Sequence, residues 1–177
     1  PMQLLESRGR ALFNALEAVK AEGWVEKTGV SVYDVAELEQ LVDQYAFDLV
    51  QAPLNIWDRR LVDSGWADRL KAADVELHVR SAFLQGLLLM APQDRPEKFS
   101  RWSQVWQAWD AWLLESECSP LQACLRYLHA LTPVDRVVVG VDTSAQLQQI
   151  LSAAQGELGE LPKFDWMGDQ RLLNPAC

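Results

Sequence analysis

Polar side chains that can bind a ligand accompany each of four apolar, β-forming stretches of the sequence. Ser31 ends the first stretch, Gln51 lies in the second, Arg80 ends the third and Asp142 follows the fourth. Hydroxyl, amide and guanidinium groups bind polar or phosphorylated ligands by directed hydrogen bonds. Parallel α/β sheets bind ligands at the carboxyl ends of their strands. We therefore expect a ligand site where these four stretches end.

The segments that must position these residues alternate between β and α patterns. The second helical pattern begins at Asp34, with Glu37 as a capping partner; Ser119 and Thr143 are further N-cap candidates. Strands are expected in residues 24–33, 47–55, 75–83 and 134–141, and helices in residues 3–21, 35–46, 58–73, 99–116, 119–131 and 145–156.

This alternation predicts an α/β fold of parallel βα units with right-handed crossovers. Four strands are too few for a closed eightfold barrel, so the fold is either an open four-stranded sheet or a partial (half) TIM barrel with outer helices. The length of 177 residues predicts a single domain over residues 1–177. Glycines and prolines predict a mostly irregular tail over residues 156–177.

The amino-acid composition limits the classes of binding partner that we expect. A net charge of −9 disfavours nucleic acid and anionic lipid. The apolar runs are too short to span a membrane, and no secretory signal is recognised. The spacing of Cys118 and Cys124 fits neither a zinc site nor a redox motif, and only two histidines are present, so we expect no metal. Cysteines without a disulfide or metal role are typical of proteins in a reducing compartment, so we expect a cytoplasmic location.

Two features leave alternatives open. Trp102, Trp106, Trp109 and Trp112 fall on one helical face, which is either buried against the rest of the fold or a platform for a sugar or a partner. The buried arrangement is favoured, because stripes at this spacing usually face a core. Arg80 either binds a phosphate or pairs with a carboxylate.

Four segments in order resemble the aldo/keto reductase family, where they would form barrel strands five to eight with their following helices. The resemblance covers roughly residues 10–155, and its segments are KTGVSVYDVAELEQL, FDLVQAPLNIWDRRL, VELHVRSAFLQGLLL and VDRVVVGVDTSAQLQQIL.

The resemblance implies a (β/α)8 fold and a nicotinamide cofactor that reduces carbonyl groups. It places Ser31 and Gln51 on the nicotinamide carboxamide. The third segment would pack against the nicotinamide and cover the pyrophosphate, and the fourth would hold the adenosine phosphate. The residues implied for these two roles are Arg80, Ser81, Phe83 and Gln85, then Gly140, Val141, Asp142, Thr143 and Gln146.

The chain departs from the family pattern in two ways. The catalytic Asp, Tyr, Lys and His of the family come from the first half of the barrel, and no residue here matches them, so no catalytic residue is assigned. Asp142 stands where the family offers a cation to a 2′-phosphate, and a carboxylate repels phosphate. The cofactor is therefore left as NADP or NAD.

Two main hypotheses follow. The chain is the cofactor-binding half of a carbonyl-reducing barrel, which would not be catalytic alone. The alternative is a non-catalytic binding or assembly module whose open sheet edges are closed by a second copy, giving a homodimer. A flavodoxin-like module is a third and less favoured hypothesis. Such a module should have a glycine-rich phosphate loop after its first strand, whereas the segment here, SVYDV, contains no glycine.

Overall fold

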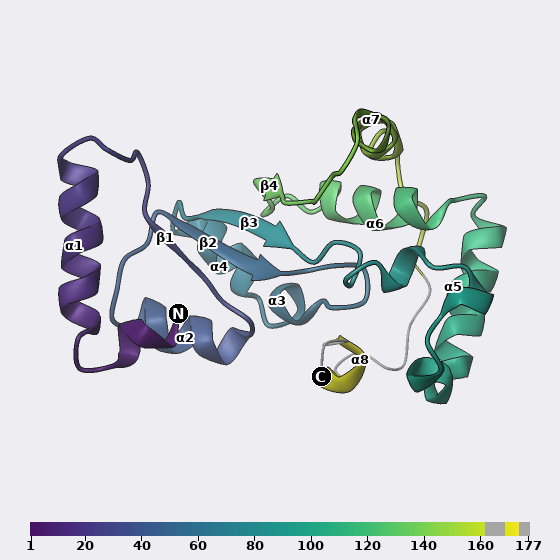
Figure 1. Ribbon diagram of the computed structural model, residues 1–177, viewed down its shortest axis with the longest axis horizontal. Coiled ribbons are helices and arrows are strands. Elements are labelled where there is room, and N and C mark those ends of the chain that lie inside the picture. The colour runs from purple at the N-terminus through teal and green to yellow at the C-terminus, as the bar shows by residue number, and fades with distance from the viewer. Residues whose placement is uncertain (162–168, 174–177) are drawn as a thin grey trace. The chain divides into compact units, whose positions relative to one another are not determined.

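The central feature of the computed structural model is a four-stranded parallel sheet in the order β1-β2-β3-β4 (Figure 1). The strands are β1 (Gly29–Ser31), β2 (Leu49–Pro53), β3 (Glu76–Arg80) and the two-residue β4 (Arg136–Val137). The structure describes residues 1–161 and 169–173. The α/β class and the parallel strands predicted from the sequence are confirmed.

The described chain divides into two compact units. The first comprises residues 1–53, 60–80 and 133–136, and the second comprises residues 54–59, 81–132 and 137–177. That residues 1–177 form a single domain stays a prediction.

The strands of the first unit alternate between a buried and a more open face, as the period of two requires. Val50, Ala52, Leu77 and Val79 are at most 1% exposed and form the buried face. The residues between them on β2 and β3 are only partly buried. Helix α4 (Trp66–Ala72) lies against β3 (Figure 1). The open face therefore contains Ser31, Gln51 and Arg80, the predicted site residues that lie on these strands.

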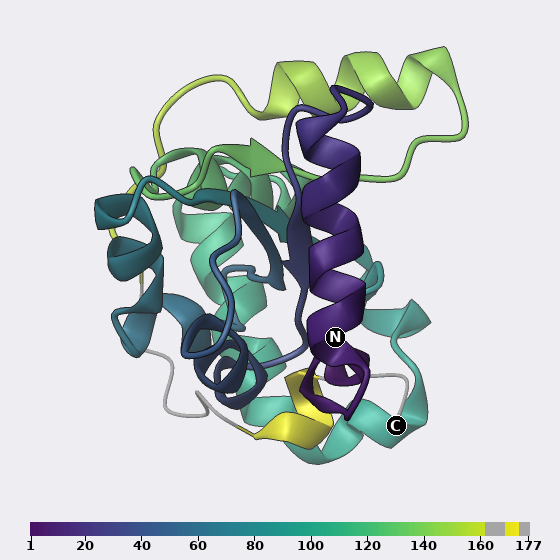
Figure 2. The ribbon, with the colours of Figure 1, turned by 90° about the vertical axis from the view of Figure 1, so that its left-hand side faces the viewer.

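The first unit begins with the 3-10 helix η1 (Met2–Leu5) and α1 (Gly9–Ala21), the purple helix nearest the viewer in Figure 2. The Phe13 ring of α1 lies 4.8 Å from the Tyr45 ring, and Lys20 Nζ lies 2.5 Å from Asp48 Oδ1. Helix α2 (Val35–Val42) has Asp34 as its N-cap, as predicted, and the Asp34 side chain accepts a hydrogen bond from the Glu37 N–H. Glu37 departs from the predicted capping box, because its Oε2 accepts from the Tyr33 N–H at 2.7 Å.

The prediction of a single helix over residues 58–73 is wrong, because the structure has two helices there. These are α3 (Arg60–Asp63) and α4, and Gly65 separates them with a φ of 79°. A left-handed residue cannot continue an α-helix, and glycine adopts that conformation without a steric penalty.

The second unit is mainly helical. Its 3-10 helices are η2 (Leu87–Leu89), η3 (Pro92–Asp94) and η4 (Glu97–Trp102), and its α-helices are α5 (Ser103–Glu115), α6 (Pro120–His129), α7 (Ser144–Ala153) and α8 (Gln170–Leu173). Ser119 and Thr143 are N-caps, as predicted, and each forms a full capping box with the residue three positions later. Among the described residues, no helix is long and apolar enough to cross a membrane.

The tryptophan stripe is buried, which confirms the core interpretation and excludes the exposed platform. Trp109 is fully buried, and Trp102, Trp106 and Trp112 are at most 9% exposed. The Arg95 guanidinium lies 4.2 Å from the Trp106 ring centroid and binds both carboxylate oxygens of Asp110 at 2.8 and 2.5 Å. This bidentate pair fastens the segment before α5 onto that helix.

Strand β4 is shorter than the stretch expected over residues 134–141. Asp135 explains where pairing begins: its N–H donates to the Leu77 carbonyl oxygen, and its Oδ2 accepts from the Leu77 N–H at 2.8 Å. Val138 and Val141 beyond the strand are 45% and 42% exposed. The tail expected to be irregular contains the short α8; residues 162–168 and 174–177 of that tail lie outside the described residues.

Substituting Arg95 by lysine should destabilise the second unit, because an ammonium group cannot reproduce the planar, two-pronged contact with Asp110. We expect a loss of about 1–3 kcal/mol in the free energy of unfolding, measured by urea denaturation. Arg101→Lys is the matched control, since Arg101 is exposed on η4. Equal losses for the two variants would contradict the role of the Arg95–Asp110 pair.

Acidification should weaken the first unit through Asp48 and Asp135. Hydrogen bonds from Lys20 and the Thr28 N–H lower the pKa of Asp48, and the Leu77 N–H and Lys71 lower the pKa of Asp135. A lowered pKa stabilises the fold above the ordinary value of about 4, and this contribution is lost as the pH falls through the folded-state pKa.

The free energy of unfolding should therefore begin to fall near about pH 5 and fall further below about pH 4, as the pH approaches the lowered folded-state pKa values. Asp135→Asn should reduce this fall, and the control Asp68→Asn, at an exposed position of α4, should not. A fall of the same size in Asp135→Asn and the unmodified chain would refute the assignment.

Candidate functional site

Ser31 and Gln51 lie side by side on the open face of the sheet. They are register partners on β1 and β2, and the Ser31 hydroxyl donates to Gln51 Oε1 at 3.2 Å. Ser31 is exposed and Gln51 is partly buried. The pair offers a hydroxyl, an amide oxygen and an amide N–H group, which together can bind a ligand that has both donors and acceptors.

The polar row continues onto β3. His78 is the register partner of Gln51, and His78 Nε2 lies 3.1 Å from Glu76 Oε2. Lys27 also binds Glu76, and the hydrogen bonds from Lys27 and His78 lower the pKa of that carboxyl. Glu76 is therefore an anion on the open face at neutral pH.

Arg80 reaches from the end of β3 to the end of β1. Its Nη2 donates to the Val32 carbonyl oxygen at 3.0 Å, and its guanidinium lies 4.7 Å from the Tyr33 ring centroid. Glu76, a carboxylate on the same strand, is bound to Lys27 and His78. Tyr33 is 65% exposed, so the stacked pair presents an aromatic surface beside Ser31 that the sequence reasoning missed.

The segment after β3 belongs to the second unit and has unusual backbone geometry. Ser81, Leu84 and Gln85 have φ values of 61°, 47° and 56° and are followed by Gly86 at 87°. Non-glycine residues with positive φ are uncommon, and such strain collects at ligand-binding loops. Gln85 is exposed and Phe83 is partly buried, so both predicted side chains are available at the surface of this loop.

The predicted phosphate segment at residues 140–146 comprises the loop before α7 and the first turn of that helix. Thr143 Oγ1 accepts from the Gln146 N–H at 3.1 Å. Gln146 Oε1 in turn accepts from the N–H groups of Asp142 and Thr143 at 2.8 and 3.2 Å. Two backbone donors that would suit an anion are thus bound by the Gln146 side chain. Gly140 and Val141 are exposed, so the structure leaves this segment accessible.

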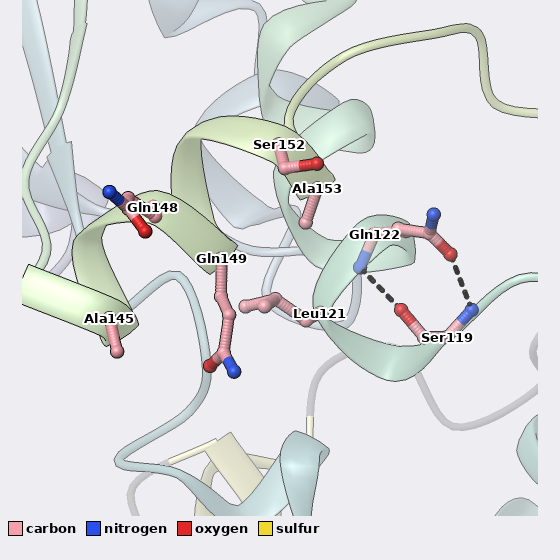
Figure 3. A pocket seen from close by; sticks show the side chains of 8 residues that line it. All are labelled: Ser119, Leu121, Gln122, Ala145, Gln148, Gln149, Ser152 and Ala153. Carbon is pink, nitrogen blue, oxygen red and sulfur yellow. Dashed lines mark hydrogen bonds between the residues drawn. The ribbon is translucent and has the colours of Figure 1, made fainter.

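A cavity of about 650 Å³ lies between α6 and α7, and sequence reasoning did not identify it (Figure 3). Its lining is uncharged: Ser119, Leu121, Gln122, Ala145, Gln148, Gln149, Ser152 and Ala153. In Figure 3 the Gln149 side chain extends from α7 toward Leu121 at the start of α6. Carboxamides beside a leucine suit a flat, neutral group with hydrogen-bonding edges.

The cysteines offer no competing nucleophile in the described part of the chain. Cys118 is 8% exposed and Cys124 is fully buried, and neither forms a disulfide. Burial raises the pKa of both thiols, most strongly that of Cys124. Thiols kept in the neutral form are poor nucleophiles, which supports the interpretation of these cysteines as idle.

Comparisons with known proteins identify the family to which the fold belongs. A model of the aldo/keto reductase family matches residues 9–163. The solved aldo-keto reductase AKR11C1 from Bacillus halodurans, in its holo form, is similar with a TM-score of 0.64 and 20% identity, covering 83% of this chain and 51% of that chain. Aldose reductase from Giardia lamblia is similar with a TM-score of 0.59 and 15% identity, covering 96% and 50%.

A search of curated proteins found no match. The chain spans about half the length of the solved relatives, as a half-barrel would. The family match, the parallel βα order and the half-length coverage lead to one conclusion: the chain belongs to the aldo/keto reductase family and corresponds to about half of a (β/α)8 barrel.

Proposed function

We propose that this chain is the nicotinamide-cofactor-binding half of a carbonyl-reducing barrel. The observation behind the proposal is the Ser31–Gln51 pair, in which two polar side chains meet in register on the open face of the sheet. Membership of the aldo/keto reductase family supports the cofactor class.

The Ser31–Gln51 pair is complementary to a primary carboxamide. The Ser31 hydroxyl now donates to Gln51 Oε1. A bound carboxamide would take over both groups, because its oxygen can accept from Ser31 and its NH₂ group can donate to Gln51 Oε1. The exchange replaces one internal hydrogen bond by two to the ligand, and it fixes the ring to which the carboxamide is attached.

The family resemblance supplies candidate residues for the rest of the cofactor. We assign Ser81, Phe83 and Gln85 to the pyrophosphate, and Gly140 to Thr143 to the adenosine phosphate. The uncharged cavity between α6 and α7 suits the adenine base, since Gln149 can donate to and accept from a purine edge. Phosphate binding would require Gln146 to release the N–H groups of Asp142 and Thr143.

Asp142 favours NAD over NADP in this proposal. Asp142 is exposed beside the start of α7, and its carboxylate would repel a 2′-phosphate. The bound nicotinamide would supply a hydride to a carbonyl carbon. No residue of this chain matches the catalytic residues of the family, so the chain's own role is to bind and orient, and we expect no reductase activity from it alone. Its buried free thiols fit a reducing cytoplasm.

Cofactor binding can be tested by titrating the chain with NADH and NADPH and recording energy transfer from tryptophan to the reduced nicotinamide. We expect saturable binding, tighter for NADH. Gln51→Ala should weaken both by about tenfold, because one carboxamide contact is lost. The matched control Gln40→Ala, at an exposed position of α2, should bind like the unmodified chain. No binding up to millimolar cofactor would refute the proposal.

A second candidate function is assembly through the edges of the sheet, and a specific observation favours it. Strand β1 is at one edge and β4 at the other. Several large apolar side chains are exposed in the chain segments that precede β1 and follow β4: Leu12, Val19, Trp24 and Val25 before β1, and Val138, Val141, Leu147 and Leu151 after β4. Open edges and apolar patches favour association, so we propose that a second copy covers them in a homodimer.

Sedimentation velocity over a range of concentrations tests the homodimer. We expect Leu147→Glu to shift the population to monomer, because it places a charge on the exposed apolar face of α7. Leu114→Glu is the control, since Leu114 is 81% exposed on α5 and lies near neither edge strand in sequence. A chain that stays monomeric at high concentration would rule out this function and leave cofactor binding unaffected.

A further inference from the structure

A buried asparagine that the sequence reasoning left out connects two loops of the second unit. Asn55 is fully buried just after β2. Its Oδ1 accepts from the N–H groups of Trp57 and Asp58 at 2.9 and 2.8 Å, and its Nδ2 donates to the Ser81 carbonyl oxygen at 3.0 Å. Both ends of the amide are used, which fixes its orientation.

The carbonyl group that Asn55 binds lies in a segment where three non-glycine residues with positive φ occur close together. Ser81 has a φ of 61°, and Leu84 and Gln85 follow in the same left-handed region. The Leu84 N–H also donates to the Ser81 carbonyl oxygen, at 2.9 Å. Such a conformation persists only where its surroundings hold it. Asn55 and Leu84 therefore hold the peptide at which the loop turns.

We propose that Asn55 is a positioning residue for cofactor binding: through the Ser81 carbonyl it sets the course of residues 81–86 and so places the Gln85 side chain against the pyrophosphate. The inference rests on the proposed cofactor function. Gln85 is exposed and can donate its amide N–H groups to phosphate oxygens. Asn55 itself is buried and does not touch the ligand.

The decisive variant is Asn55→Asp, which keeps an oxygen for the Trp57 and Asp58 N–H groups and replaces the donor to Ser81 with an acceptor. Near neutral pH we expect ADP and NADH to bind about tenfold more weakly, while adenosine, which has no pyrophosphate, binds as before. Acidification should restore ADP affinity, since the protonated carboxyl regains a donor. Asn14→Asp, at an exposed position of α1, is the matched control.

A double-mutant cycle separates positioning from general destabilisation. Gln85→Ala should weaken ADP binding, and adding Asn55→Asp should cause little further loss, because both changes remove the same contact. Additive losses, or equal losses for ADP and adenosine, would overturn the proposal. If the Asn55 variants do not fold, the exposed Gln85→Ala variant decides, and unchanged ADP affinity overturns it.

The two proposals fail in different ways. An unmodified chain that binds neither NADH nor ADP refutes cofactor binding and the role of Asn55 with it. An unmodified chain that binds both, beside an Asn55→Asp variant of equal affinity, overturns the role of Asn55 alone and leaves the cofactor proposal standing.

Discussion

The parallel register of β1, β2 and β3 determines what this fold can bind. It aligns Ser31 with Gln51, Gln51 with His78, and Pro53 with Arg80. Because side chains alternate between faces, a slip of one residue would bury Gln51 and expose Val50. Asp48 helps to set this register, because it binds the Thr28 N–H before β1. Asp135 acts at the other side of the sheet, where it binds the Leu77 N–H of β3 just before β4 begins.

Much of the fold follows from local sequence signals. Strands β2 and β3 lie within the stretches predicted from their apolar runs, and β1 covers only Gly29–Ser31 of the predicted residues 24–33. The helix starts at Asp34, Ser119 and Thr143 were predictable from capping chemistry. The break at Gly65 was not predicted, because it depends on a left-handed backbone conformation at that residue. The short β4 was not predicted either, because the Asp135 side chain accepts the hydrogen bond from the Leu77 N–H. Such details are set by tertiary contacts that periodicity does not report.

The candidate site was predictable in its residue types but only partly in its geometry. The neighbourhood of Ser31 and Gln51 follows from consecutive parallel strands. The direction of the Arg80 side chain, the use of the Asp142 N–H by Gln146 and the role of Asn55 each depend on one rotamer or one backbone angle. The sequence has no periodic signal for any of them, and a half-length family member leaves the catalytic residues unassigned.

The most direct test of the carboxamide site is the NMR resonance of the Gln51 side-chain amide in ¹⁵N-labelled protein, assigned with Gln51→Ala. Reduced nicotinamide mononucleotide should shift this resonance in a saturable manner, and an analogue without the carboxamide should not. A resonance that stays unchanged while the mononucleotide binds elsewhere would contradict the assignment of Ser31 and Gln51 to the nicotinamide.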